Sequence, residues 1–126
     1  ARLRARHSGD AAFHAIAADL RTWRPQRLYD LWHDRAVLHF MVAEEERVAY
    51  RDALQSAVKP GGAVIISTFA ADGPERCSGL PVRRYSAADL DAFLGPGFER
   101  REAHVFDHET PGGAVQRFQS ARYLRS

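Results

Sequence analysis

The sequence lacks the features of a disulfide-stapled, membrane-spanning or secreted protein. Its 126 residues include a single cysteine, Cys77, which excludes an internal disulfide and favours a reducing compartment. No apolar run approaches the roughly 18 residues of a membrane span, and no secretory h-region is visible at the start. We therefore expect a cytoplasmic protein with no membrane partner.

An excess of charge of one sign is also missing. Lysine and arginine total 18 and aspartate and glutamate total 16, which leaves a net charge of +2. The densest basic cluster, Arg2, Arg4 and Arg6, is spaced like one flank of a helix, and we expect it to form a solvated helix face. The sequence therefore predicts no nucleic-acid partner.

Motifs for metal or nucleophile chemistry are absent as well. His104 and His108 would share one face of a strand, but no C-x-x-C or H-x-x-x-H pattern supplies further ligands, so we expect no metal. No serine stands in a G-x-S-x-G context, and no phosphate-binding P-loop occurs. These absences argue against a zinc site, a serine hydrolase and a P-loop nucleotidase.

What the sequence does contain is the pattern of one α/β domain over residues 1–126, since this length suffices for one core but not for two. Apolar alternation between turn residues predicts the strands. Three glutamates at 44–46 favour the start of a helix, and Ser86 is expected to cap a second one. In chain order we expect strands at 11–18 and 28–33, a helix at 43–58, a strand at 63–69, a long loop at 70–84, a helix at 86–94, and a hairpin of strands at 98–108 and 114–124.

Two segments carry a family resemblance. Residues 29–40 read YDLWHDRAVLHF, and residues 59–62 read KPGG, where the first helix is expected to stop and turn into a buried strand. Together they resemble class I methyltransferases that use S-adenosylmethionine, in particular the small-molecule branch with the thiopurine and tellurite methyltransferases. The resemblance implies an α/β fold, namely a partial doubly wound (Rossmann-like) three-layer sheet of mainly parallel strands with a C-terminal antiparallel hairpin.

The resemblance also implies where a cofactor would bind, because ligands of such sheets sit at the carboxyl ends of the strands. Asp19 and Leu20 would lie against the adenine, with the Asp19 carboxylate accepting a hydrogen bond from the exocyclic amine; the alternative is that Asp19 caps the next turn. His33, Asp34 and Arg35 would lie beside the methionine part of the cofactor. The alternative for Asp34 and Arg35 is an ion pair that caps the loop.

Two further residues of this segment are predicted to be structural. Asp30 lies near the start of its strand, at the end away from the expected ligand crevice. His39 stands between Leu38 and Phe40, where a packed, hydrogen-bonded histidine is expected in preference to a general base.

The Gly-rich turn that cradles S-adenosylmethionine in the intact family domain is not found in these residues. Gly9, Gly61 and Gly62 are the only early glycines, and none of them follows a strand as that turn requires. We therefore expect a truncated, C-terminal part of the domain, with S-adenosylmethionine as cofactor if the N-terminal half is supplied. Loss of the two central strands would leave unpaired strand edges, which predicts a homodimer or an association through exposed sheet edges.

Two function classes follow from this reading. The first is a methyltransferase for a small-molecule acceptor, or its truncated C-terminal part. In such an enzyme the protein mainly aligns nucleophile and methyl group, because the sulfonium is already an activated leaving group. The alternative is a catalytically inactive, methyltransferase-derived module that acts as a dimeric interaction protein or a small-ligand-binding protein.

Overall fold

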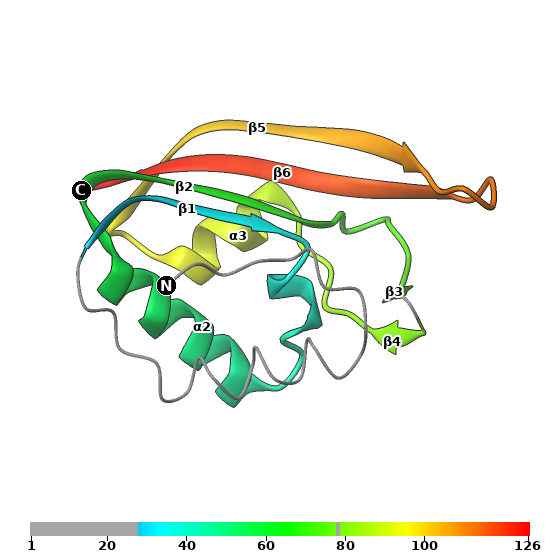
Figure 1. The fold of residues 1–126 in the computed structure, drawn as a ribbon, viewed down its shortest axis with the longest axis horizontal. Helices are drawn as coiled ribbons and strands as arrows, with labels where there is room; N and C mark the ends of the chain where they lie inside the picture. The colour runs from blue at the N-terminus through cyan, green and yellow to red at the C-terminus, as the bar shows by residue number, and fades with distance from the viewer. Residues whose placement is uncertain (1–27, 78) are drawn as a thin grey trace.

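The computed structural model describes residues 28–77 and 79–126 (Figure 1). The strand predicted at 11–18 and the site residues Asp19 and Leu20 lie outside the described residues. The elements of the described part are, in chain order, β1 (Tyr29–Arg35), the 3-10 helix η1 (Leu38–Phe40), α2 (Glu44–Ala57), β2 (Val58–Phe69), β3 (Arg76–Cys77), β4 (Leu80–Pro81), α3 (Ala87–Leu94), β5 (Phe98–Glu109) and β6 (Val115–Arg125).

The main sheet has the strand order β1-β2-β6-β5. Strands β1 and β2 pair in parallel, whereas β6 is antiparallel to both β2 and β5. It follows that β1, β2 and β5 run in one direction and β6 alone runs in the other. This arrangement confirms the predicted α/β class with mainly parallel strands and a C-terminal antiparallel hairpin.

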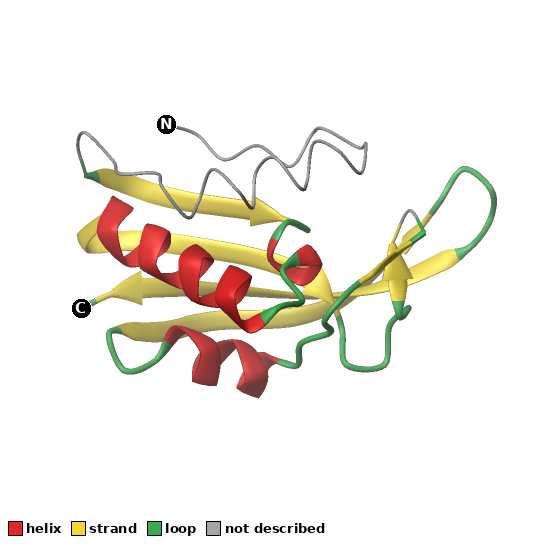
Figure 2. Ribbon diagram, turned by 90° about the horizontal axis from the view of Figure 1, so that it is seen from below, coloured by secondary structure: helices red, strands yellow, loops and turns green. Residues whose placement is uncertain are grey.

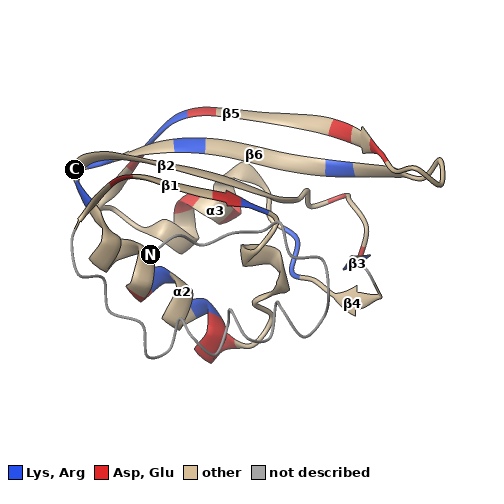
Figure 3. Ribbon diagram, viewed as in Figure 1, with Lys and Arg blue, Asp and Glu red and all other residues tan. Residues whose placement is uncertain are grey.

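Helices α2 and α3 lie against the same face of this sheet, as the two perpendicular views show (Figures 1 and 2). The described residues therefore supply two of the three predicted layers. The hairpin of β5 and β6 projects well beyond the ends of β1 and β2 in both views. Charged residues of both signs are interspersed over the sheet and the helices (Figure 3).

The core lies between the sheet and the two helices. Successive side chains of a strand point to opposite faces, so every second residue of β1 and β2 enters this layer. Fully buried apolar and aromatic side chains fill it, each contributing about 1.5–3 kcal/mol by its removal from water. They are Trp32, Val64, Ile66 and Tyr123 from the strands, Tyr50 and Leu54 from α2, and Leu90 and Leu94 from α3.

Both helices begin within a residue of the predicted start, and Ser86 is the cap predicted for α3. The N–H of Asp89 donates to Ser86 Oγ (3.1 Å), and the N–H of Ser86 donates back to Asp89 Oδ2 (2.9 Å). At the start of α2, the Glu46 carboxylate accepts from the N–H of Ala43 (3.2 Å). Each contact satisfies a backbone group that the first helical turn leaves without an intrahelical partner.

The segment at 59–62 departs from the predicted turn. Strand β2 begins at Val58, directly after α2, and runs through this segment instead of starting at residue 63. Val58 lies opposite Tyr29 and Ala63 lies opposite Leu31, so residues 59–62 bulge out between two paired positions, and an ion pair joins Lys59 to Asp30. Asp30 thus has the structural place predicted for it. Gly61 supplies a positive φ of 84° at the bend that results.

The long loop predicted at 70–84 is also wrong in part. It contains the short strands β3 and β4, which form a two-stranded antiparallel ribbon. Gly79, directly before β4, has a φ of 80°, which glycine adopts without strain. Beyond the ribbon, the N–H of Arg83 donates to the carbonyl of His39 (2.8 Å), which fixes the loop to η1.

Candidate functional site

The carboxyl ends of β1 and β2 lie at one end of the sheet, because these strands are parallel. His33, Asp34 and Arg35 are the last three residues of β1, so the structure places them where the resemblance puts a ligand crevice. It does not gather their side chains on one surface. Asp34 is 3% exposed and faces the helices, whereas His33 and Arg35 are exposed on the opposite face.

The Asp34 carboxylate is held by three donors inside the protein. The N–H of Val37 donates to Oδ1 (2.6 Å), while the N–H of Leu38 (2.9 Å) and the hydroxyl of Tyr50 (2.5 Å) donate to Oδ2. The Tyr50 hydroxyl in turn accepts from Trp32 Nε1 (3.0 Å). Asp34 thus caps the turn between β1 and η1 through backbone groups and Tyr50.

The electrostatics of this buried network follow from its isolation from water. Burial raises the pKa of Asp34 from its ordinary 3.8 to about 6, against the lowering effect of the three hydrogen bonds. Burial, together with the neighbouring Asp34 carboxylate, raises the pKa of Tyr50 well above its ordinary value. The tyrosine hydroxyl therefore stays protonated and remains a donor to Asp34.

The backbone is strained at the residue that follows this strand. Ala36 has a φ of 72°, the one non-glycine residue of the described part with a positive φ. Its N–H donates to the carbonyl of Ser67 at the end of β2 (2.9 Å), and the Asp34 contacts to Val37 and Leu38 hold the other side of the turn. Such a conformation costs about 1–3 kcal/mol and is characteristic of functional sites. The sequence carries no signal for it, because alanine does not mark a left-handed position.

His39 ties η1 to the end of β2, as predicted for a packed histidine. It is 0% exposed, and its Nδ1 accepts from the N–H of Phe69 (3.0 Å). The imidazole contacts the rings of Phe40 and Phe69, each with its centroid at 4.6 Å. Burial lowers the pKa of His39 to about 3, so the ring is neutral at physiological pH.

The face of the sheet opposite the helices carries polar groups near the carboxyl ends of the parallel strands. Arg35 lies opposite Ser67, which lies opposite Ser120, which lies opposite His104, and residues so paired share one face. The Ser67 and Ser120 hydroxyls are 3.3 Å apart. His33 shares the face with this row. A guanidinium, imidazoles and hydroxyls arranged this way can bind a carboxylate or another anionic group.

Neither a metal cluster nor a membrane span is found in the part of the chain that the structure describes. No three histidine, cysteine, aspartate or glutamate side chains at 28–77 and 79–126 are grouped so that they could hold a metal ion. The helices within these ranges are too short or too polar to cross a bilayer.

The fold that these elements define is that of the class I methyltransferases. Three similar solved structures are the didemethyltoxoflavin N1-methyltransferase of Burkholderia thailandensis, the N-methyltransferase NodS of Bradyrhizobium japonicum and a SAM-dependent methyltransferase of Methanosarcina mazei. Their TM-scores are 0.64, 0.61 and 0.62, at sequence identities of 17%, 15% and 13%.

The likeness extends over most of this chain but over only part of each neighbour. It covers 85%, 84% and 80% of this chain and 48%, 56% and 62% of those three chains, in the same order. This chain therefore spans about half to three-fifths of the length of the structures it resembles. No protein-family model and no curated protein sequence matches it.

Proposed function

We propose that this chain forms the C-terminal part of an S-adenosylmethionine-dependent methyltransferase that acts on a small molecule. The observation that carries the proposal is the shared fold, in which an antiparallel β6 lies between β2 and β5. Among the similar structures, the Burkholderia enzyme is described with bound 1,6-didemethyltoxoflavin and S-adenosylhomocysteine, a small molecule and the demethylated cofactor. The likeness of this chain to that enzyme supports a small molecule as the substrate.

The residues at the end of β1 fit one part of such a cofactor. S-adenosylmethionine supplies a methyl group on an activated sulfonium, so the protein contributes binding and alignment. The exposed Arg35 guanidinium would pair with the carboxylate of the methionine part, and His33 would donate to it from the same face. Asp34, turned inward, holds the strained turn beneath them. Contacts of Asp19 and Leu20 with the adenine remain a prediction.

Gly61 and Gly62 do not supply the turn that would cradle the cofactor. Gly61 and Gly62 lie at the amino end of β2, and the carboxyl ends of β1 and β2 are at the other end of the sheet. In the proposed enzyme this turn comes from an N-terminal half-domain. Strand β1 is at one edge of the described sheet, where it can receive the strands of that half.

A second candidate is the inactive module that associates through its sheet edge or binds a small ligand. It is favoured by the apolar residues beside the edge strand, since Leu28 is 56% exposed and Leu31 is 51% exposed in the described structure. An exposed apolar edge is a template for pairing with another chain. A second copy of this chain is the partner that we expect in that case.

Calorimetric titration of the complete gene product with S-adenosylhomocysteine tests the proposal. We expect saturable binding that the change Arg35→Gln weakens about tenfold, because a charge-assisted hydrogen bond is lost. The matched control, Arg101→Gln, removes an exposed arginine on β5 that pairs with Glu99 (2.7 Å), and it should leave binding unchanged. A folded protein that sediments as a dimer and binds no cofactor would contradict the enzyme and support the module.

A further inference from the structure

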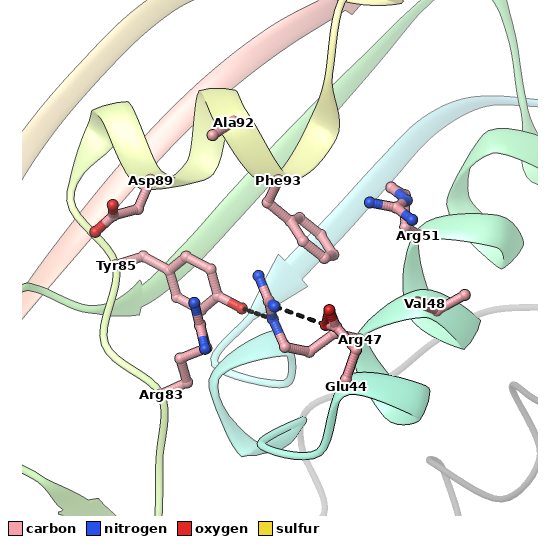
Figure 4. A pocket seen from close by; sticks show the side chains of 9 residues that line it. All are labelled: Glu44, Arg47, Val48, Arg51, Arg83, Tyr85, Asp89, Ala92 and Phe93. Atoms are coloured by element: carbon pink, nitrogen blue, oxygen red, sulfur yellow. Dashed lines mark hydrogen bonds and ion pairs between the residues drawn. The ribbon is translucent and has the colours of Figure 1, made fainter.

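A pocket opens between α2 and α3 on the helical side of the sheet. Its volume is about 210 Å³, and it is lined by side chains from both helices and from the segment that leads into α3 (Figure 4). Three guanidinium groups, those of Arg47, Arg51 and Arg83, stand around the rings of Tyr85 and Phe93. None of these residues belongs to the strand-end site described above.

The central guanidinium is already engaged within the protein. Arg47 Nε donates to the Tyr85 hydroxyl (3.1 Å), and its Nη1 donates to Glu44 Oε1 (2.9 Å). It also lies over the Phe93 ring, 5.2 Å from the centroid. With its side chain only 15% exposed, Arg47 acts as a fixed positive wall of the pocket.

The two flanking guanidiniums are held but not neutralised. The Arg51 guanidinium lies 5.9 Å from the centroid of Phe93, and that of Arg83 lies 5.9 Å from the centroid of Tyr85. Cation–π contacts of this kind position an arginine while they leave its N–H fork available. Neither residue forms an ion pair with a carboxylate among the described residues.

Two carboxylates also line the pocket, so its three guanidinium groups are offset in part. The Glu44 carboxylate pairs with Arg47, and the Asp89 carboxylate accepts the N–H of Ser86 at the start of α3 (2.9 Å). Burial raises the pKa of Tyr85, so its hydroxyl adds no negative charge. Within the described residues the lining therefore keeps an excess of positive charge, and the guanidinium groups of Arg51 and Arg83, which form no ion pair there, come from two different segments of the chain.

We propose that this pocket binds a phosphate group, either free or carried by a small molecule. A tetrahedral phosphate offers oxygens in several directions and can meet forks from opposite walls, whereas a planar carboxylate is matched by a single fork. The volume is below the roughly 300–1,000 Å³ of pockets that enclose drug-sized ligands, which suits a compact group. The site does not depend on methyl transfer, so it can be tested by itself.

Titration of the full chain by NMR of the arginine Nε–H signals, at constant ionic strength, tests this site. Inorganic phosphate and ribose 5-phosphate distinguish a free from a carried phosphate, and acetate is the carboxylate comparison. We expect saturable shifts with at least one of the two phosphates and none with acetate. The changes Arg51→Gln and Arg83→Gln should each weaken phosphate binding about tenfold.

Two further variants distinguish specific phosphate binding in this pocket from nonspecific attraction of an anion to a basic protein. Arg101→Gln makes the same change of net charge on β5, away from the pocket lining, and should leave the affinity unchanged. Arg83→Lys keeps the charge but removes the fork, and should bind with intermediate affinity. The proposal is overturned if neither phosphate gives saturable shifts, if acetate binds equally well, or if all arginine variants weaken binding alike, which would show an adventitious ion only.

Discussion

Replacement of Tyr50 by phenylalanine should destabilise the protein more than the loss of one hydroxyl group suggests. The hydroxyl is both the acceptor for Trp32 Nε1 (3.0 Å) and a donor to the Asp34 carboxylate (2.5 Å), and all three residues are buried. Tyr50→Phe removes the hydrogen bond that the Trp32 indole donates to this hydroxyl and takes one donor from a buried carboxylate.

The magnitude follows from these two losses. A hydrogen bond between neutral groups contributes about 0.5–1.5 kcal/mol, and one to a charged group contributes about 1.5–3 kcal/mol. We therefore expect the free energy of unfolding to fall by about 2–4 kcal/mol, measured by urea denaturation at pH 8. That loss is a large part of the 5–15 kcal/mol that is typical of a domain.

The effect should also depend on pH, because Asp34 titrates within the network. Its folded pKa of about 6 lies above its ordinary 3.8, so this group makes the free energy of unfolding fall by about 3 kcal/mol as the pH rises from about 4 to about 6. Tyr50→Phe removes a hydrogen bond that lowers this pKa, and the fall should then extend above pH 6. The deficit of the variant should be larger at pH 8 than at pH 5.

A control variant keeps the test specific. Tyr123→Phe, on β6, removes a hydroxyl that donates to Asp91 Oδ1 (2.6 Å) and makes no contact with Asp34. It should lower stability without changing the pH at which Asp34 titrates. A loss below 1 kcal/mol for Tyr50→Phe, or an equal loss at pH 5 and pH 8, would refute the reasoning.

Four further predictions concern the backbone and His39. Ala36→Gly should stabilise the protein by about 0.5 kcal/mol in urea denaturation, because relief of the left-handed strain exceeds the added entropy of glycine. Gly62→Ala should cost about 2–3 kcal/mol, since its Cβ would lie 2.9 Å from the carbonyl oxygen of Lys59. Gly61→Ala, where the space is open but φ is 84°, should cost only about 1 kcal/mol by the same assay. The His39 ring should show no NMR titration between pH 5 and 8, because burial lowers its pKa to about 3. Since this folded pKa is below the ordinary 6.5, the contribution of His39 to the free energy of unfolding should be lost as the pH falls below about 6.5.

Local signals predicted the elements of the fold well. The hairpin predicted for strands at 98–108 and 114–124 is present as β5 and β6. The helix that follows Ser86 begins where the capping residues place it. In these cases the decisive interactions lie within a few residues of one another, which is why a sequence pattern reveals them.

Features set by distant contacts could not be predicted in this way. The segment at 59–62 has the residues of a turn, yet Val58 before it and Ala63 after it both pair with β1, so it becomes a bulge within β2. Tyr50 is 16 residues from Asp34 and 18 from Trp32, so their network exists only once α2 packs on β1. The left-handed Ala36 is likewise imposed by contacts to Asp34 and Ser67 on either side of its turn.

The likeness of fold makes the strand ends the place to look for the cofactor. Amide NMR spectra of the complete gene product, titrated with S-adenosylhomocysteine, test this most directly. The proposed function predicts shifts at Arg35 and Ala36 and at Ala70, the residue after β2, with none at Asp30 and Gly62 at the other end of these strands. Shifts confined to the Asp30 and Gly62 end, or no shifts at saturating ligand, would contradict a cofactor site at the carboxyl ends of β1 and β2.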